Sequence, residues 1–238
     1  PQACMTAKPL NLPWNQSSQY WLCVLAPSSL PAQAQDKLKA LGLWDVQEGG
    51  LTGFVVSAEQ DWGPRWAQIY GVLREFAVED RVFAAVIPGD GAPLDPALID
   101  QYRKPAADVQ AIADSLWLGD ALMNDRLLCY LQPVMNGRGG VFGYESFARA
   151  RAEDGGVIGG WEIVRACRAL SIHHAVDRQL QIQAIKTFAG AGLSGVLFIN
   201  FLPGFIQRPE VYLEGLTEAV RAHGVVPKQV ALDVTNSE

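Results

Sequence analysis

Residues 127–149 read LLCYLQPVMNGRGGVFGYESFAR, and this stretch decides the fold of the C-terminal half of the chain. Its two ends, 127–135 and 141–147, are rich in apolar and aromatic residues, which favour strands. The turn between them, 136–140, is Asn-Gly-Arg-Gly-Gly, and a glycine-rich turn between two apolar runs is typical of a β-hairpin. The stretch therefore predicts two paired strands, with Glu145 on the second.

Helix and strand patterns alternate after this hairpin. We expect helices at 160–170, 177–191 and 209–223, and strands at 196–201 and 230–235. Repeated strand and helix units are typical of a (β/α) barrel. The two later strands carry Asn200 and Asp233, which together with Glu145 offer oxygen ligands in chain order. This pattern indicates the beginning of a metal site.

These motifs resemble the EAL family of cyclic di-GMP phosphodiesterases over residues 126–238. That family's domain opens with a Tyr-Gln-Pro-Ile strand, a glycine-rich turn and a Gly-Tyr-Glu-Ala-Leu-x-Arg strand. The corresponding residues here are Gln132-Pro133 and the GYESFAR run at 143–149. The resemblance implies a bacterial cyclic di-GMP signalling protein whose C-terminal part is the first portion of a modified TIM barrel.

The resemblance also implies a metal site. In the family, divalent metal is bound by the strand glutamate, by the asparagine of an Asn-x-Ser-Pro turn and by the first glutamate of a Glu-x-Thr-Glu strand. These positions fall on Glu145, Asn200 and Asp233. The implied cofactor is Mg²⁺ or Mn²⁺, and the implied reaction is hydrolysis of cyclic di-GMP to the linear dinucleotide.

Three further residues are implied to bind the substrate. The family arginine that contacts a ligand phosphate falls on Arg149, the glutamine of the opening strand falls on Gln132, and the motif leucine is replaced by Phe147. Departures of this kind leave an alternative open, a degenerate EAL-like module that binds cyclic di-GMP or a protein partner without hydrolysis. Because the later catalytic residues of the family have no counterpart in the sequence, we expect the 238-residue chain alone to be inactive.

For Asp177 and for the histidine pair His173 and His174, we expect structural roles and no part in binding a ligand or metal. Asp177 falls where the family often has an acidic residue opening a helix, and we interpret it as a helix N-terminal charge that stabilises the macrodipole. His173 and His174 are adjacent and therefore point in different directions, which is poor geometry for a shared metal. We expect both histidines at the surface or at a helix entry.

The N-terminal half has a different pattern. Strand-like runs at 20–25, 53–56 and 81–87 alternate with helical runs at 32–43 and 62–76. This βαβαβ order predicts a small parallel sheet. We therefore expect an α/β protein with a tail at 1–18, a small regulatory or interaction domain at 19–92, a helical linker at 93–125 interrupted by Pro105, and the EAL-like barrel portion at 126–238.

Composition limits the kinds of partner and the cell compartment that we expect for this protein. The net charge is −6 and no Lys/Arg cluster is present, which argues against binding a nucleic-acid polymer. The four cysteines have no Cys-x-x-Cys spacing, so we expect free thiols in a reducing compartment. No apolar run reaches the length of a membrane span, and we expect a cytoplasmic protein. Besides cyclic di-GMP, a homodimer or a protein partner is left open by the sequence.

Overall fold

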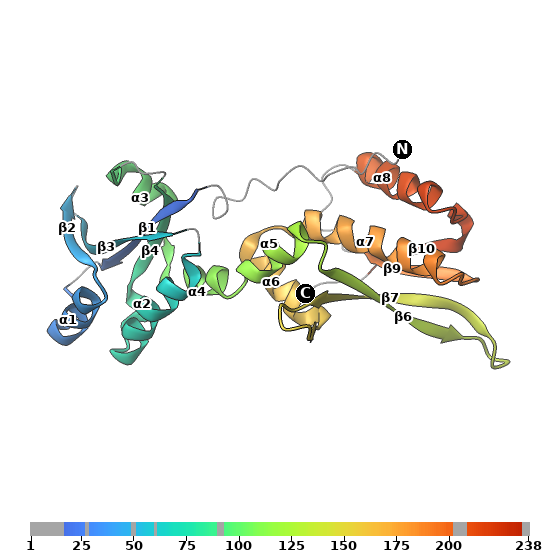
Figure 1. Ribbon diagram of the computed structural model, residues 1–238, viewed down its shortest axis with the longest axis horizontal. Coiled ribbons are helices and arrows are strands. Elements are labelled where there is room, and N and C mark those ends of the chain that lie inside the picture. Colours follow the sequence, from blue (N-terminus) through green and yellow to red (C-terminus); the bar gives the residue numbers. More distant parts are fainter. Residues whose placement is uncertain are drawn as a thin grey trace. The chain divides into compact units, whose positions relative to one another are not determined.

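The computed structural model describes residues 17–26, 29–48, 51–59, 61–89, 93–201 and 209–234. The chain divides into two compact units, residues 1–116 (unit 1) and 117–238 (unit 2). Figure 1 shows the elements of each unit. Most of the expected tail at 1–18 lies outside the described residues, as do Cys4 and residues 202–208 and 235–238. Among the described helices, none is long and apolar enough to cross a lipid bilayer.

Unit 1 contains one antiparallel sheet. Its strands are β1 (Gln19–Ala26), β2 (Trp44–Glu48), β3 (Leu51–Glu59), β4 (Phe83–Pro88) and the two-residue β5 (Lys104–Pro105), in the order β2-β3-β1-β4-β5. Each pair of neighbours runs antiparallel. With α1 (Ala32–Ala40) after β1 and α2 (Gly63–Glu75) after β3, the first four strands form a split βαβ arrangement.

The expectation of a parallel sheet in this unit was wrong. The sequence pattern missed β2, a five-residue strand that follows α1 and alternates apolar and polar residues at Trp44, Asp45 and Val46. Because β2 turns back into β3 as a hairpin, β3 returns antiparallel and pairs with β1. Helix α1 therefore joins two strands that run in the same direction but are separated by β3.

Helices cover both faces of this sheet. Ile99 of α3 (Pro96–Tyr102) packs on Cys23 and Val55 on one face. Figure 1 shows α1 and α2 on the opposite side from α3, and in α2 the side chains of Trp66 and Leu73 are fully buried. Pro105 separates α3 from α4 (Ala106–Ala113), as expected for a proline in a helical stretch.

Unit 2 begins within α5 (Leu116–Met123), which the predicted hairpin follows. Strands β6 (Leu127–Met135) and β7 (Val141–Arg151) pair antiparallel, which confirms the hairpin. They are followed by the short β8 (Val157–Ile158), then α6 (Gly160–Leu170), α7 (His173–Gly190), β9 (Val196–Phe201), α8 (Pro209–Ala222) and β10 (Val230–Val234). The sheet order is β10-β9-β7-β6, and β7, β9 and β10 are parallel, as in a (β/α) barrel.

The helices α7 and α8 cover one face of this sheet. Ile185 and Phe188 of α7 and Val220 of α8 form a buried cluster with Leu197 and Ile199 of β9. Strand side chains alternate between the two faces, so the residues between these apolar ones point to the other face. The face opposite α7 and α8 is therefore the one that carries Glu145 and Asn200.

Helix α7 starts four residues earlier than the sequence pattern predicts. Ser171 has a left-handed backbone (φ 56°) at the end of α6, and the Ile172 N–H donates to the Cys167 carbonyl. This closed turn lets α7 begin directly at His173. Asp177 consequently lies beyond the first turn, and the interpretation of Asp177 as a helix N-terminal charge was wrong.

Candidate functional site

The residues implied as metal ligands lie on neighbouring strands of unit 2. Gln132 is the cross-strand partner of Glu145, and Glu145 is also aligned with Phe198. Asn200, two residues after Phe198, is aligned with Asp233. Because side chains alternate along a strand, all of these residues share one face of the sheet. Glu145 and Asn200 are partly buried, whereas Gln132 and Asp233 are exposed.

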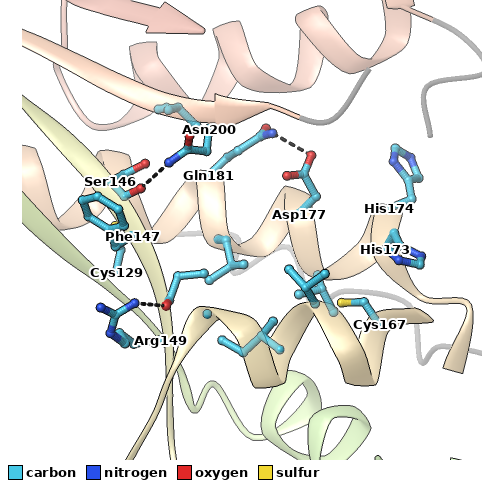
Figure 2. Close-up of a pocket in the computed structure, with 17 residues that line it drawn as sticks. Cys129, Ser146, Phe147, Arg149, Cys167, His173, His174, Asp177, Gln181 and Asn200 are labelled. Atoms are coloured by element: carbon cyan, nitrogen blue, oxygen red, sulfur yellow. Dashed lines mark hydrogen bonds between the residues drawn. The ribbon is translucent and has the colours of Figure 1, made fainter. Parts of the chain in front are cut away.

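Phe147 and Arg149 follow Glu145 at every second position of β7 and therefore belong to the same face. The Arg149 guanidinium carbon lies 5.5 Å from the ring centroid of Tyr130 and 6.0 Å from that of Phe147. Its Nη1 donates to the Ala148 carbonyl at 2.7 Å (Figure 2). Two aromatic rings and one backbone carbonyl thus hold the charge of Arg149 against the sheet.

Asn200 joins the strands at this face. Its Nδ2 donates to the Ser146 carbonyl at 2.9 Å and to Glu145 Oε1 at 3.4 Å. Both amide protons are thereby directed to β7, which leaves the Oδ1 atom as an acceptor. The amide oxygen and the carboxylates of Glu145 and Asp233 are hard oxygen donors of the kind that Mg²⁺ and Mn²⁺ prefer.

The donor set therefore fits a divalent cation, with one amide and two carboxylates. In the part of the chain that the structure describes, no group of three or more His, Cys, Asp or Glu side chains lies close enough to hold a metal. The candidate centre consequently depends on Asn200 as its third residue.

A pocket of about 260 Å³ lies at the C-terminal ends of β7 and β9, on the helix-covered side of the sheet, and Phe147, Arg149 and Asn200 of the opposite face also line it. Helices α6 and α7 close its other side, and Figure 2 shows Asn200, Phe147 and Arg149 at one end of it. Its apolar walls include the side chains of Ile163 and Val164 on α6, Val176 and Leu180 on α7, and Ile199 on β9. Binding sites in barrels of parallel strands lie at this same strand end.

The polar lining of the pocket comes mainly from α7. Asp177 and Gln181 are one turn apart, and Gln181 Nε2 donates to Asp177 Oδ2 at 2.8 Å. His173 and His174 also line the pocket, although His174 itself is exposed. Burial, and to a smaller extent the charge of Arg168, lowers the pKa of His173 below its usual value. At neutral pH the His173 ring is therefore mainly uncharged.

Sequence reasoning missed Asp177 and Gln181 as pocket residues. The spacing of four residues places them on one face of the helix expected at 177–191, but nothing in the sequence shows that this face borders a pocket. The histidines do lie at a helix entry, as expected, and their position in the pocket wall could not be foreseen from their being adjacent.

Two cysteines also line the pocket. Burial raises the pKa of Cys167 to about 12 and that of Cys129 to about 11. Cys23, in the core of unit 1, has its pKa raised to about 12 for the same reason. All three are free thiols, in agreement with the expectation from their spacing. Their raised pKa values keep them protonated and poorly nucleophilic at neutral pH.

Comparison with known protein families identifies the family of this chain. The family model for the EAL domain matches residues 116–238, slightly more than half of the chain. No curated protein sequence matches the chain.

Solved structures that resemble the chain include EAL domains. The FimX EAL domain of Pseudomonas aeruginosa, bound to c-di-GMP, is 23% identical with a TM-score of 0.44 over 51% of this chain and 50% of that one. The FimX EAL domain of Xanthomonas citri, in complex with c-di-GMP, is 20% identical with a TM-score of 0.48 over 56% and 53%. A standalone EAL protein of Vibrio cholerae O395, in its c-di-GMP-bound form, is 25% identical with a TM-score of 0.38 over 47% and 46%. The chain thus spans about half the length of these structures.

Proposed function

This chain belongs to the EAL domain family, and on that premise we propose that unit 2 contributes a binding site for cyclic di-GMP in a signalling protein. The observation that carries the proposal is the arrangement of Arg149, Glu145 and Asn200 on one sheet face beside the pocket that contains Asp177. Cyclic di-GMP has two phosphates and two guanine bases. A site for it needs a cation for phosphate and a slot for a flat base with an N–H edge.

Arg149 meets the first requirement. A guanidinium offers several N–H donors in a fixed plane and is well suited to phosphate oxygens. The rings of Tyr130 and Phe147 already order this side chain, so less side-chain entropy is lost when it binds an anion. Arg149 lines the pocket together with Phe147, which supports a role in holding one phosphate there.

The pocket meets the second requirement. Its apolar walls suit the faces of a purine ring, and the Asp177 carboxylate supplies only acceptors. Guanine presents two adjacent donors on its Watson–Crick edge, N1–H and the 2-amino group, whereas adenine presents no such pair. A carboxylate at one end of an apolar slot therefore favours guanine over adenine.

The more specific part of the proposal is that the intact protein also hydrolyses cyclic di-GMP. Glu145, Asn200 and Asp233 are the residues that would hold Mg²⁺ or Mn²⁺. When bound, such an ion supplies Lewis-acid activation of water for attack on a phosphodiester. This chain's own residues hold the ligand beside that centre: Arg149 orients the phosphate, and Gln132, opposite Glu145, borders the same face.

A second candidate function is binding without hydrolysis. Glu145 already receives a hydrogen bond from Asn200, and Asn200 is anchored on the Ser146 carbonyl. These bonds hold the two strands together without an ion. This observation favours a module that responds to cyclic di-GMP by binding alone, as the departures at Phe147 and Asp233 also suggest.

For unit 1 we propose a regulatory or interaction role, since it has its own core and its own sheet. The expected domain at 19–92 belongs to this proposal, extended by α3 and α4, which fall in the expected linker at 93–125 and lie in unit 1. A homodimer or a protein partner is part of the same proposal.

The test measures binding of cyclic di-GMP to the whole chain by isothermal titration calorimetry, with and without Mn²⁺. We expect binding that weakens about tenfold or more in Arg149→Ala, since a hydrogen bond to a charged group is removed. Arg151→Ala, an exposed residue two positions along the same strand, is the matched control and should bind as the unmodified chain does. No binding in either condition would overturn the proposed function.

Chromatography of the same samples then separates the two candidate functions. Linear dinucleotide that forms only with Mn²⁺ supports hydrolysis. Tight binding with the cyclic nucleotide still intact agrees with the inactivity expected of the 238-residue chain and leaves binding as its supported function.

A further inference from the structure

We propose that Gln181 is a positioning residue that sets the guanine selectivity of the pocket by fixing the Asp177 carboxylate. The inference rests on the proposed function, because it concerns how that same site distinguishes bases. Gln181 does not touch the ligand in this scheme. It acts through its hydrogen bond to Asp177.

Burial makes the presence of Gln181 informative. Only 4% of Gln181 is exposed, and among the described buried polar residues the others are serines. A buried amide costs free energy unless it is hydrogen-bonded, and an apolar side chain of similar size would avoid that cost. Ile185, the next residue on the same face of α7, is fully buried and apolar. The presence of a glutamine on this buried face of α7 is therefore explained by the hydrogen bond of its amide to Asp177.

The geometry shows what the amide does. Gln181 Nε2 donates to Asp177 Oδ2 across one helical turn at 2.8 Å, and both side chains line the pocket (Figure 2). A carboxylate rotates freely about its terminal bond unless a partner holds it. The bond to Gln181 restrains this rotation, so that the carboxylate plane is set before a ligand arrives. Such preorganisation increases the gain from a two-point contact.

Selectivity follows from that restraint. A fixed carboxylate can accept from both N1–H and the 2-amino group of guanine, whereas hypoxanthine offers N1–H alone. A two-point contact of this kind separates a correct base from a wrong one by about tenfold or more. A carboxylate that rotates loses much of the second contact. Removal of the Gln181 amide should therefore reduce the preference for guanine more than it reduces binding of hypoxanthine.

The same helix offers a matched control. Gln179 Nε2 donates to Asp125 Oδ1 at 3.3 Å, and neither residue lines the pocket. Gln179→Met and Gln181→Met therefore remove the same kind of bond, between the same residue types, from two sides of α7. Methionine keeps the length of the side chain and fills a buried site readily.

The experiment measures the affinities of the whole chain for cyclic di-GMP and cyclic di-IMP by calorimetry. We expect the ratio of the two affinities to fall about tenfold in Gln181→Met, to fall at least as far in Asp177→Asn, and to stay unchanged in Gln179→Met. The double variant Gln181→Met/Asp177→Asn should show no further loss. An unchanged ratio in Gln181→Met, or fully additive losses in the double variant, would overturn the inference.

Further measurements distinguish a failure of this inference from a failure of the proposed function and from a failure of the variant to fold. Absence of cyclic di-GMP binding by the unmodified chain would reject the proposed function. The crystal structure of ligand-free Gln181→Met would still test the positioning: an Asp177 carboxylate in its original orientation refutes it, and a rotated one supports it. If Gln181→Met does not fold, Gln181→Asn, whose amide is one methylene too short, should give the same fall in the ratio.

Discussion

Arg149 shows how single side chains build this site from their immediate surroundings. Tyr130 and Phe147 are cross-strand partners, and the guanidinium lies over both rings. Glu145 is held in a comparable way by the amide of Asn200. In both cases a charged group stays partly buried because a neighbour on the same sheet face satisfies it.

Replacement of Glu145 tests the proposed metal centre at this scale. Glu145→Gln keeps the shape of the side chain and its contact with Asn200 but removes a negative charge, so we expect Mn²⁺ to bind at least about tenfold more weakly. Electron paramagnetic resonance of free Mn²⁺ in a titration measures this directly. Glu214→Gln on the exposed surface of α8 is the control and should leave Mn²⁺ binding unchanged. Equal Mn²⁺ affinity in both variants would exclude Glu145 as a ligand.

Thiol reactivity tests the burial of the cysteines. Because only the thiolate reacts, a pKa raised from 9.0 to about 12 at Cys23 and Cys167 should slow their alkylation about a thousandfold relative to the unfolded chain. The corresponding factor for Cys129, with its pKa at about 11, is about a hundredfold. Mass spectrometry after brief iodoacetamide treatment at pH 8, with and without urea, measures each site. Rapid labelling of Cys23 in the folded chain would contradict its burial.

These raised pKa values also predict how stability depends on pH. The folded state binds the thiol proton more tightly than the unfolded state does. The stabilisation that each buried thiol gives the folded state is therefore complete below pH 9. It is lost as the pH rises from about 9 towards 12. The free energy of unfolding in urea should therefore decrease across this range, and less steeply in Cys23→Ala. A free energy that is constant from pH 8 to pH 10.5 would argue against the shift.

At the scale of elements, β7 and β9 approach each other closely at Gly143. Gly143 is aligned with Val196, and a Cβ atom added at Gly143 would lie 2.2 Å from the Val196 carbonyl oxygen. At the end of the hairpin, Asn136 Oδ1 accepts from the backbone N–H groups of Arg138 and Gly140. The tight turn and the glycine contact together fix the register that brings Glu145 level with the residues of β9.

Substitution of Gly143 tests this register. Gly143→Ala must push β7 away from β9, and we expect it to lower the free energy of unfolding by about 1–3 kcal/mol. Gly137→Ala in the hairpin turn is the control, because an added Cβ there meets nothing within 4 Å. Urea unfolding followed by circular dichroism gives both values. Equal stability of the two variants would show that the strands adjust without cost.

At the scale of the whole molecule, each unit has a core of its own. Cys23, Val55 and Ile99 belong to the core of unit 1, and Ile185 and Leu197 to that of unit 2. Separate cores of this kind are typical of domains that fold independently. The division at residue 116 assigns α3 and α4 to unit 1.

Fragments of the chain test this division. The fragment 1–116 should give the same amide chemical shifts by NMR as the whole chain gives for these residues. The shorter fragment 1–92, which ends at the boundary expected from the sequence, lacks Ile99 and Val109, both 2% exposed. We expect it to lose dispersed resonances, because large apolar contacts are removed from the core. A well-dispersed spectrum for 1–92 would instead place the boundary before α3.

The sequence by itself determined the local elements and the family of this protein. The hairpin at 127–151, helix α6 and the strands that carry Glu145, Asn200 and Asp233 follow from patterns within a few residues, and those patterns are the ones that the EAL resemblance uses. Local turn chemistry and periodicity act over such short distances. The sharing of one sheet face by these residues then follows from alternation and from the register of neighbouring strands.

Only the tertiary structure decided the features that depend on distant pairing. The direction of the unit 1 sheet depends on β2, whose five residues give a weak signal, and on its hairpin with β3. The pocket exists because α6 and α7 pack across the ends of β7 and β9, which brings Asp177 and Gln181 towards Arg149. Packing between segments far apart in the chain leaves no periodic pattern in the sequence. For this reason the proposed base-binding side of the site became visible only in the folded molecule.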